Sequence, residues 1–95
     1  MKIRWLRHAR RQLDEAGEYS ARDNPKAAER MVRRIRLAVE NLADFPMMGR
    51  AGRVIGTREL VVPETPYIVA YRVREQVVEV LAVHHGARRW PESFD

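Results

Sequence analysis

The sequence predicts a two-layer α+β domain in which an antiparallel sheet packs against a helical hairpin. Three observations indicate this fold. Residues 57–90 contain three runs rich in Val, Ile and Tyr, separated by turn-forming residues. Two consecutive segments before them have apolar residues at helical spacing, and residues 2–6 alternate charged with apolar residues like a short edge strand. The expected order is therefore strand, helix, helix and three strands.

The last part of the chain is expected to form an antiparallel meander. Its predicted strands are residues 57–62, 67–73 and 77–84. Pro63 and Pro66 end the first strand because proline fixes φ and lacks a backbone donor. The polar residues 74–76 form the second turn.

Because side chains alternate along a strand, each strand is expected to present one side to the helices. The buried side is expected to contain Tyr67, Val69, Tyr71, Val73, Val78, Val80, Ala82 and His84. The open sheet face, meaning the side turned away from the helices, is expected to contain Glu59, Val61, Ile68, Ala70, Arg72, Glu79, Leu81, Val83 and His85. This second set is also largely apolar, which predicts that something else covers the open sheet face.

Two amphipathic helices are expected between the first strand and the meander. The first runs from Arg7 to about Arg22. Asn24 followed by Pro25 then starts the second, because Asn accepts hydrogen bonds from exposed amides and Pro at the first helical position loses no needed donor. Its apolar stripe comprises Ala28, Met31, Val32, Ile35, Val39 and Leu42. The short connection predicts an antiparallel hairpin, and residues 47–56 are expected to be a loop.

Composition narrows the class of protein. The chain has 95 residues, 45% of them hydrophobic and 33% charged, as in an ordinary globular domain, so residues 1–95 are expected to form one domain. The lack of cysteine excludes a disulfide framework or a thiolate site. No apolar run approaches the roughly 20 residues that span a bilayer, and MKIRWLRHARR lacks the apolar stretch of a signal peptide. A cytoplasmic location is expected.

The net charge of +5 comes almost wholly from arginine, because Lys2 and Lys26 are the only lysines among 18 basic residues. Guanidinium groups suit bidentate contact with phosphate or carboxylate. An arginine-rich surface also follows from a GC-rich genome. The net charge is therefore evidence about binding partners and solubility and not about the fold.

Several segments resemble the RelE/ParE superfamily of bacterial type II toxin-antitoxin toxins. They are DFPMMGRAGRV after the second helix, RELVVPETPYIVAYRV, and VVEVLAVHHGARRWP near the C-terminus, together with the size and the element order. The resemblance covers nearly the whole chain. It implies the RelE/ParE-like fold and a toxin of the plasmid stabilisation type, neutralised by a cognate antitoxin in a hetero-oligomer.

The superfamily contains two mechanisms. RelE-like members cut mRNA in the ribosome, whereas ParE-like members inhibit DNA gyrase. RelE-like sites resemble a cluster of Lys and Arg on the open sheet face, with a His or Tyr near the C-terminus. Ile68 stands after the tyrosine where RelE-like toxins are expected to have arginine, so the ParE-like interpretation is favoured. A RelE-like endonuclease using His85 and Arg88, and a degenerate toxin that only binds its partner, are the alternatives.

Contacts with partners are expected at two sets of residues. The antitoxin-binding set comprises Arg33, Arg34, Arg36, Ile68, Ala70, Arg72, Leu81 and Val83. The target-binding set comprises Arg88, Arg89 and Trp90, since Arg and Trp are prominent among interface hot spots; the alternative for Trp90 is packing on the domain. His84 and His85 are adjacent in a strand and point to opposite faces, so neither a metal nor a cofactor is expected.

Overall fold

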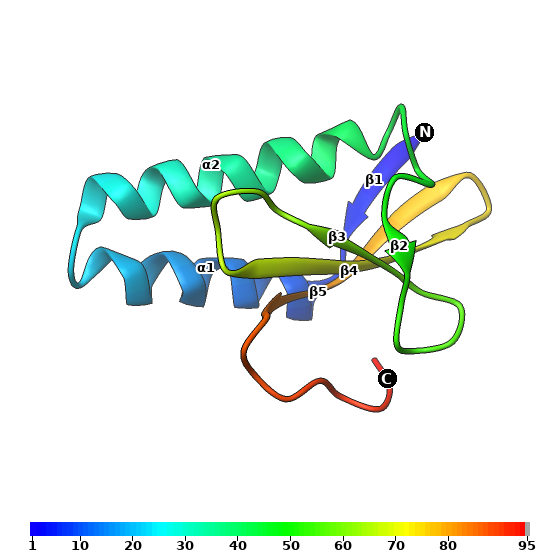
Figure 1. Cartoon of the computed structure of the whole chain (residues 1–95). Coiled ribbons are helices and arrows are strands. Elements are labelled where there is room, and N and C mark those ends of the chain that lie inside the picture. The colour runs from blue at the N-terminus through cyan, green and yellow to red at the C-terminus, as the bar shows by residue number, and fades with distance from the viewer. Residues whose placement is uncertain (95) are drawn as a thin grey trace.

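The computed structural model describes residues 1–94. Its elements are β1 (Lys2–Trp5), α1 (Arg7–Ala21), α2 (Pro25–Asn41), β2 (Arg50–Ala51), β3 (Arg58–Val61), β4 (Tyr67–Arg74) and β5 (Val77–His85). The five strands form one sheet in the order β1-β5-β4-β3-β2. The α1–α2 hairpin packs on it, and the segment after β5 turns back beneath the strands (Figure 1). The predicted two-layer α+β fold is confirmed.

Two details of the sheet differ from the prediction. The sheet is mixed, because β1 pairs with β5 in parallel. The direction of β1 relative to β5 depends on the path of the whole chain between the two strands. The local sequence pattern of β1 does not encode that path. A short strand, β2, also lies within the predicted loop, with Arg50 opposite Glu59 and Ala51 opposite Arg58. Neither Arg50 nor Ala51 has a strand-forming side chain, so this pairing arises from the contacts that β3 offers.

The helix and hairpin ends follow the local signals. The Asn24 side chain accepts a hydrogen bond from the backbone N–H of Ala27 at 3.1 Å, and Pro25 opens α2 as predicted. Between β4 and β5 the turn residues Glu75 and Gln76 have φ values of 50° and 67°. This is the left-handed backbone of a tight two-residue hairpin, which matches the twist of the strands it joins.

The core lies between the hairpin and the sheet. Ile35 on α2 and Tyr71 on β4 are both fully buried in the same apolar cluster, as predicted. The Tyr71 hydroxyl donates to the carbonyl of Pro46 at 2.7 Å and accepts from the N–H of Gly49 at 2.9 Å. Burial raises the pKa of Tyr71, so the phenol keeps the proton that it donates. This residue therefore attaches the loop after α2 to the middle of the sheet.

A bulge interrupts the pairing of β4 with β5. Ala70 lies opposite Ala82, but the next residue, Tyr71, lies opposite Val80. Leu81 is thus an extra residue on β5. An inserted residue reverses the alternation of side chains beyond it.

The reversal corrects four predicted positions. Val83 and His85 were expected on the open sheet face, but Val83 belongs to the core and His85 lies opposite Tyr67 on the helix side. Ala82 and His84 were expected on the buried side, but they lie on the open sheet face beside Ala70 and Ile68. The N–H of Val83 is satisfied by the side-chain oxygen of Gln12 on α1, at 3.0 Å.

Candidate functional site

The open sheet face is closed in part by the chain's own C-terminal tail, residues 87–94. Ile68, Ala70, Leu81 and Ala82 all lie on this face and are buried. A groove of about 650 Å³ runs between the tail and the sheet, with Leu6, Leu81 and Ala82 among its lining residues. The expectation that something covers this face is met here by a segment of the same chain.

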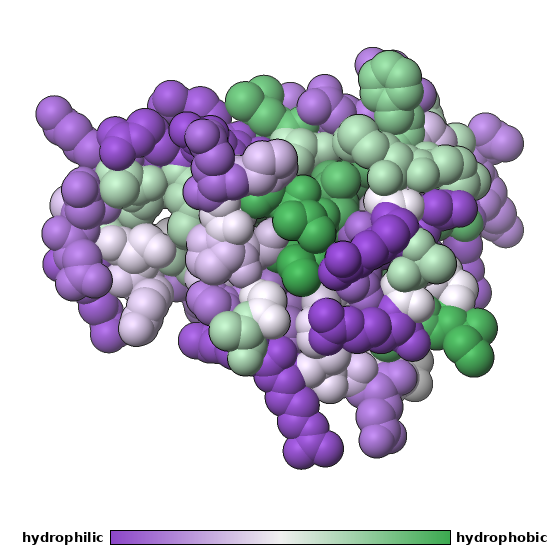
Figure 2. Space-filling model, viewed as in Figure 1, coloured by the Kyte–Doolittle hydropathy of each residue, from purple (hydrophilic) through white to green (hydrophobic). Residues whose placement is uncertain are grey.

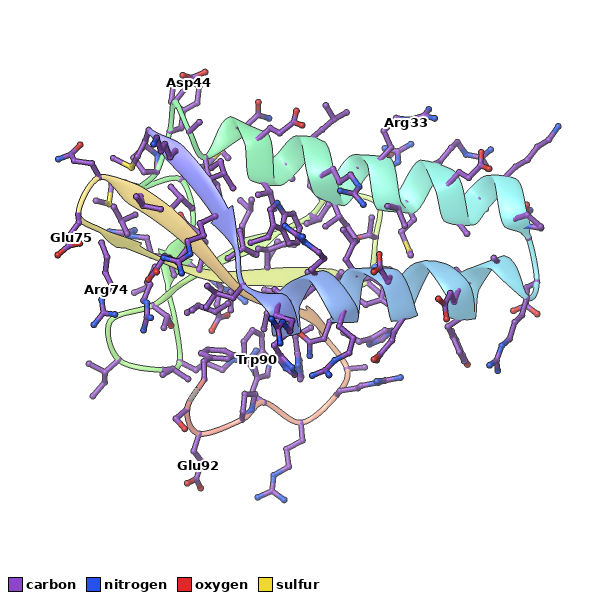
Figure 3. The ribbon with its side chains drawn as sticks, turned by 180° about the vertical axis from the view of Figure 1, so that it is seen from behind. Arg33, Asp44, Arg74, Glu75, Trp90 and Glu92 are labelled. Carbon is purple, nitrogen blue, oxygen red and sulfur yellow. The ribbon has the colours of Figure 1, made fainter. Side chains whose placement is uncertain are left out.

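One aromatic residue anchors the tail. The Trp90 ring lies 4.7 Å from the ring of His84, and the Arg53 guanidinium lies 4.6 Å from the centre of the Trp90 ring. Phe94 packs edge-on against Trp90, with ring centres 6.3 Å apart. Trp90 is turned toward the domain and Glu92 away from it (Figure 3). Of the predicted target-binding set, Arg88 and Arg89 are exposed, whereas Trp90 is half-buried and packs on the domain.

A buried carboxylate neutralises arginines at one end of the open sheet face. Glu59 on β3 is only 2% exposed. It accepts hydrogen bonds from the Arg50 side chain at 3.1 Å and from the backbone N–H of Arg53 at 2.8 Å. The Arg53 Nε atom also lies 3.9 Å from Glu59. This carboxylate therefore holds the loop that places Arg53 over Trp90.

A second carboxylate, Glu79 on β5, also pairs with arginines. Glu79 accepts a hydrogen bond from the Nε of Arg72 at 2.7 Å, and an Arg4 nitrogen lies 3.9 Å away. The hydrogen bond from Arg72 holds the pKa of Glu79 below its usual range, against the opposing effect of burial. Arg72, which we predicted to bind the antitoxin, is thus already paired with a carboxylate.

His85 and Arg88 come together on the other side of the sheet. Both line a pocket of about 320 Å³ beside α1, along with Tyr67. The Tyr67 and His85 rings meet edge to face at 5.4 Å, and His85 Nδ1 accepts a hydrogen bond from the N–H of Ala87 at 3.1 Å. Burial raises the pKa of Tyr67, while the charge of Arg88 acts to lower it. An acid-base group and a cation therefore share a pocket, but it is not on the open sheet face.

The predicted arginines of α2 divide into two environments. Arg34 forms an ion pair with Glu64 in the β3–β4 turn. Arg33 and Arg36 line a groove of about 570 Å³ between α1 and α2. Arg33 projects outward from α2 (Figure 3). The helices approach closely at Gly17, where an added Cβ would lie 3.0 Å from the Val32 side chain.

The sequence reasoning did not identify this interhelical groove. Its walls include the small residues Gly17, Ala21 and Ala28. Small residues at facing positions of two helices let the helices approach closely and leave a shallow channel beside their contact. The spacing of these small residues in the sequence could have indicated the groove. Gly17 and Ala21 are four residues apart on one helix face.

A separate apolar surface was also missed. Phe45, Met47 and Met48 are 63%, 61% and 49% exposed in the loop between α2 and β2. Hydrophobic atoms gather over this loop, at the upper right of Figure 2. An exposed apolar patch of this kind is typical of a contact surface, and flexible methionines adapt to varied partners.

Two exclusions apply to the part of the chain that the structure describes. Between residues 1 and 94, no three or more His, Asp or Glu side chains come together as they would around a metal ion. Neither helix in that range has both the length and the apolar character needed to cross a bilayer.

A helical hairpin on a sheet of this order, with a basic tail after the last strand, defines the chain as a toxin of the RelE/ParE superfamily of type II toxin-antitoxin systems. Residues 3–90 match the family described as the ParE toxin of the type II toxin-antitoxin system, parDE. The chain belongs to this ParE toxin family.

Known relatives agree with this assignment. The chain is 48% identical to a Sinorhizobium fredii protein named "Putative toxin Y4kP", over 96% of this chain and 94% of the relative. It is 31% identical to Toxin RelE2 of Caulobacter vibrioides, over 92% of this chain and 97% of that protein. A structure titled "Chromosomal ParDE TA system from P. aeruginosa" contains a chain of the same fold, with a TM-score of 0.80 and 26% identity over 90% of this chain and 95% of that one.

Proposed function

We propose that this toxin stops growth by binding and inhibiting DNA gyrase in the cytoplasm, and that a cognate antitoxin neutralises it. The observation that supports binding over RNA cleavage is the pairing of arginines on the open sheet face with Glu59 and Glu79. Cleavage of RNA develops negative charge at the phosphate, and one well-placed donor there is worth about 10²–10³ in rate. Carboxylates beside the arginines oppose that stabilisation.

The surface that we propose for the target is the exposed part of the C-terminal tail. Arg88 and Arg89 follow the end of β5 and are exposed. The packing of Trp90 fixes where the backbone of this tail runs. The two arginines would therefore meet gyrase from a defined position.

The alternative, a RelE-like ribosome-dependent mRNA endonuclease, has one structural argument in its favour. His85, Tyr67 and Arg88 share a pocket, and they supply an acid-base group and a phosphate-binding group. These are the minimum requirements for cleavage of RNA by its ribose 2′-hydroxyl.

Assays of the purified toxin separate the two functions. We expect inhibition of gyrase supercoiling, or trapping of the cleaved gyrase complex, and no codon-specific cuts in mRNA during reconstituted translation. The double change Arg88→Ala and Arg89→Ala should weaken gyrase inhibition about tenfold or more, because exposed arginines are frequent hot spots. Arg10→Ala is the control, because Arg10 is exposed on α1 and lines neither the groove nor the pocket beside the tail; it should leave inhibition unchanged.

Other results in the same assays would support one of the two alternatives. Codon-specific mRNA cuts that disappear with His85→Ala or Arg88→Ala, in variants that still fold, would establish the endonuclease. A chain that binds an antitoxin but affects neither gyrase nor translation would be a degenerate toxin.

We further propose that the antitoxin covers the interhelical groove and part of the open sheet face. Acidic side chains would meet Arg33 and Arg36, and apolar anchors would enter the groove beside Val32. A stable complex of this kind buries about 1,000–2,000 Å² in total. Val83 lies in the core beneath the helices, so we leave it out of the surface.

Hydrogen exchange with and without the cognate antitoxin tests this placement. We expect protection in α2 and in residues 68–84. Arg33→Glu with Arg36→Glu should weaken the complex by about tenfold or more, because like charges then face each other. Arg30→Glu is the control, since Arg30 is exposed on the same helix and does not line the groove. Unchanged exchange in both regions would exclude this surface.

A further inference from the structure

The docking position of Trp90 contains an unusual pair of buried atoms. We call this position the Trp90 seat; it consists of His84, Arg53, Leu81 and Ala82. The ring nitrogens His84 Nε2 and Trp90 Nε1 are both buried, and no group in residues 1–94 forms a hydrogen bond with either. Nearly all buried polar atoms in proteins have a partner, and leaving one unpaired is costly.

The two unpaired nitrogens weaken the closure of the tail. Closure buries the indole between the His84 ring and the Arg53 guanidinium, which is favourable. The same closure removes both nitrogens from water without replacing their hydrogen bonds. This cost opposes closure, so another segment can take the place of the tail if it pairs with His84 Nε2, while the displaced Trp90 Nε1 returns to water.

The tail itself indicates what kind of segment fits. Its sequence WPESFD places an aromatic anchor next to acidic residues. In the seat, the aromatic ring meets the Arg53 guanidinium, and Arg50 and Arg53 are drawn together around Glu59. Two guanidinium groups share the single Glu59 carboxylate, so the rim keeps a net positive charge, which favours carboxylates in whatever binds there. A carboxylate or carbonyl oxygen is also the group that an unpaired ring N–H requires.

We propose that the Trp90 seat is a docking site for a protein segment in trans: an extended acidic peptide with one aromatic anchor, which displaces residues 88–94 and accepts a hydrogen bond at His84. The antitoxin as the source of this segment rests on the proposed function, whereas the seat and its chemistry do not. Because the tail is tethered, it competes at a high effective concentration. A natural partner therefore also needs contacts outside the seat, and Leu6 and His8, which line the same groove, offer them.

A peptide supplied in trans tests the seat without an identified partner. The probe is a fluorescent peptide of the sequence ARRWPESFD, which is the chain's own residues 87–95. The full chain with Trp90→Ala should bind it, measured by anisotropy, about 10–100-fold more tightly than the unaltered chain, whose seat is open in only a small fraction of molecules. Arg88→Ala is the matched control, because Arg88 is in the same tail but does not line the groove.

Each outcome decides the proposal. The same peptide with alanine in place of its tryptophan should bind at least tenfold more weakly to the Trp90→Ala chain. Equal binding of both peptides, or equal binding to the altered and unaltered chains, would overturn the seat. If Trp90→Ala does not fold, fluorotryptophan in the unaltered chain gives a second reading: excess unlabelled peptide should shift the Trp90 resonance toward its solvent-exposed value, and no shift would overturn the seat. If the toxin does not inhibit gyrase, these peptide-binding results still stand, so the two proposals can fail separately.

Discussion

Replacing Ile35 with alanine is expected to lower the free energy of unfolding by about 2–5 kcal/mol. Ile35 is 0% exposed and lies in the cluster that also contains Tyr71 and Val80. Its truncation leaves a cavity between α2 and the sheet that neither layer can close without moving the other. A domain of this size has about 5–15 kcal/mol in total, so this loss is a large part of its stability.

Urea denaturation measures this loss. Leu37→Ala is the matched control, because Leu37 is on the same helix, has the same number of carbon atoms and is 53% exposed. That control should change stability by no more than about 0.5 kcal/mol. If Ile35→Ala also cost less than about 0.5 kcal/mol, the helix would not be packed on the sheet through this residue.

Replacing Gly49 with alanine is expected to cost about 1–3 kcal/mol, toward the upper end of that range. A Cβ at this buried glycine would lie 2.7 Å from both the Cε1 and the hydroxyl oxygen of Tyr71, and 2.9 Å from the carbonyl oxygen of Glu59. Neither neighbour can yield cheaply. Tyr71 is fully buried, and the Glu59 oxygen belongs to the backbone of β3. The displaced ring would also lose its hydrogen bond from the Gly49 N–H.

Gly86→Ala is the control for Gly49→Ala. There an added Cβ would have its nearest contact at 3.4 Å, which is ordinary packing distance. Denaturant melts of the two variants should differ by at least about 1 kcal/mol. Equal stability would mean that the loop after α2 does not depend on its attachment to Tyr71.

The sequence by itself determined the two helices, the three strands of the meander and the family. Proline at 63 and 66 ends β3, and the Asn24–Pro25 pair starts α2, because each acts through its own backbone and its nearest neighbours. The helical spacing that includes Ile35 and the alternation that includes Tyr71 put both residues in the core. These signals are local, and the fold satisfies them without conflict.

The tertiary structure alone decided which side chains lie on the open sheet face and where the tail packs. The bulge at Leu81 exists because β5 pairs with β4 in a shifted register, and it moves Val83 and His85 to the helix side and His84 to the open sheet face. The parallel pairing of β1 and the seating of Trp90 likewise depend on segments far apart in the sequence. The spacing of apolar residues along a segment indicates whether the segment is a helix or a strand. It cannot report an inserted residue that arises from pairing with the partner strand, or a tail whose position depends on contact with the distant Arg53.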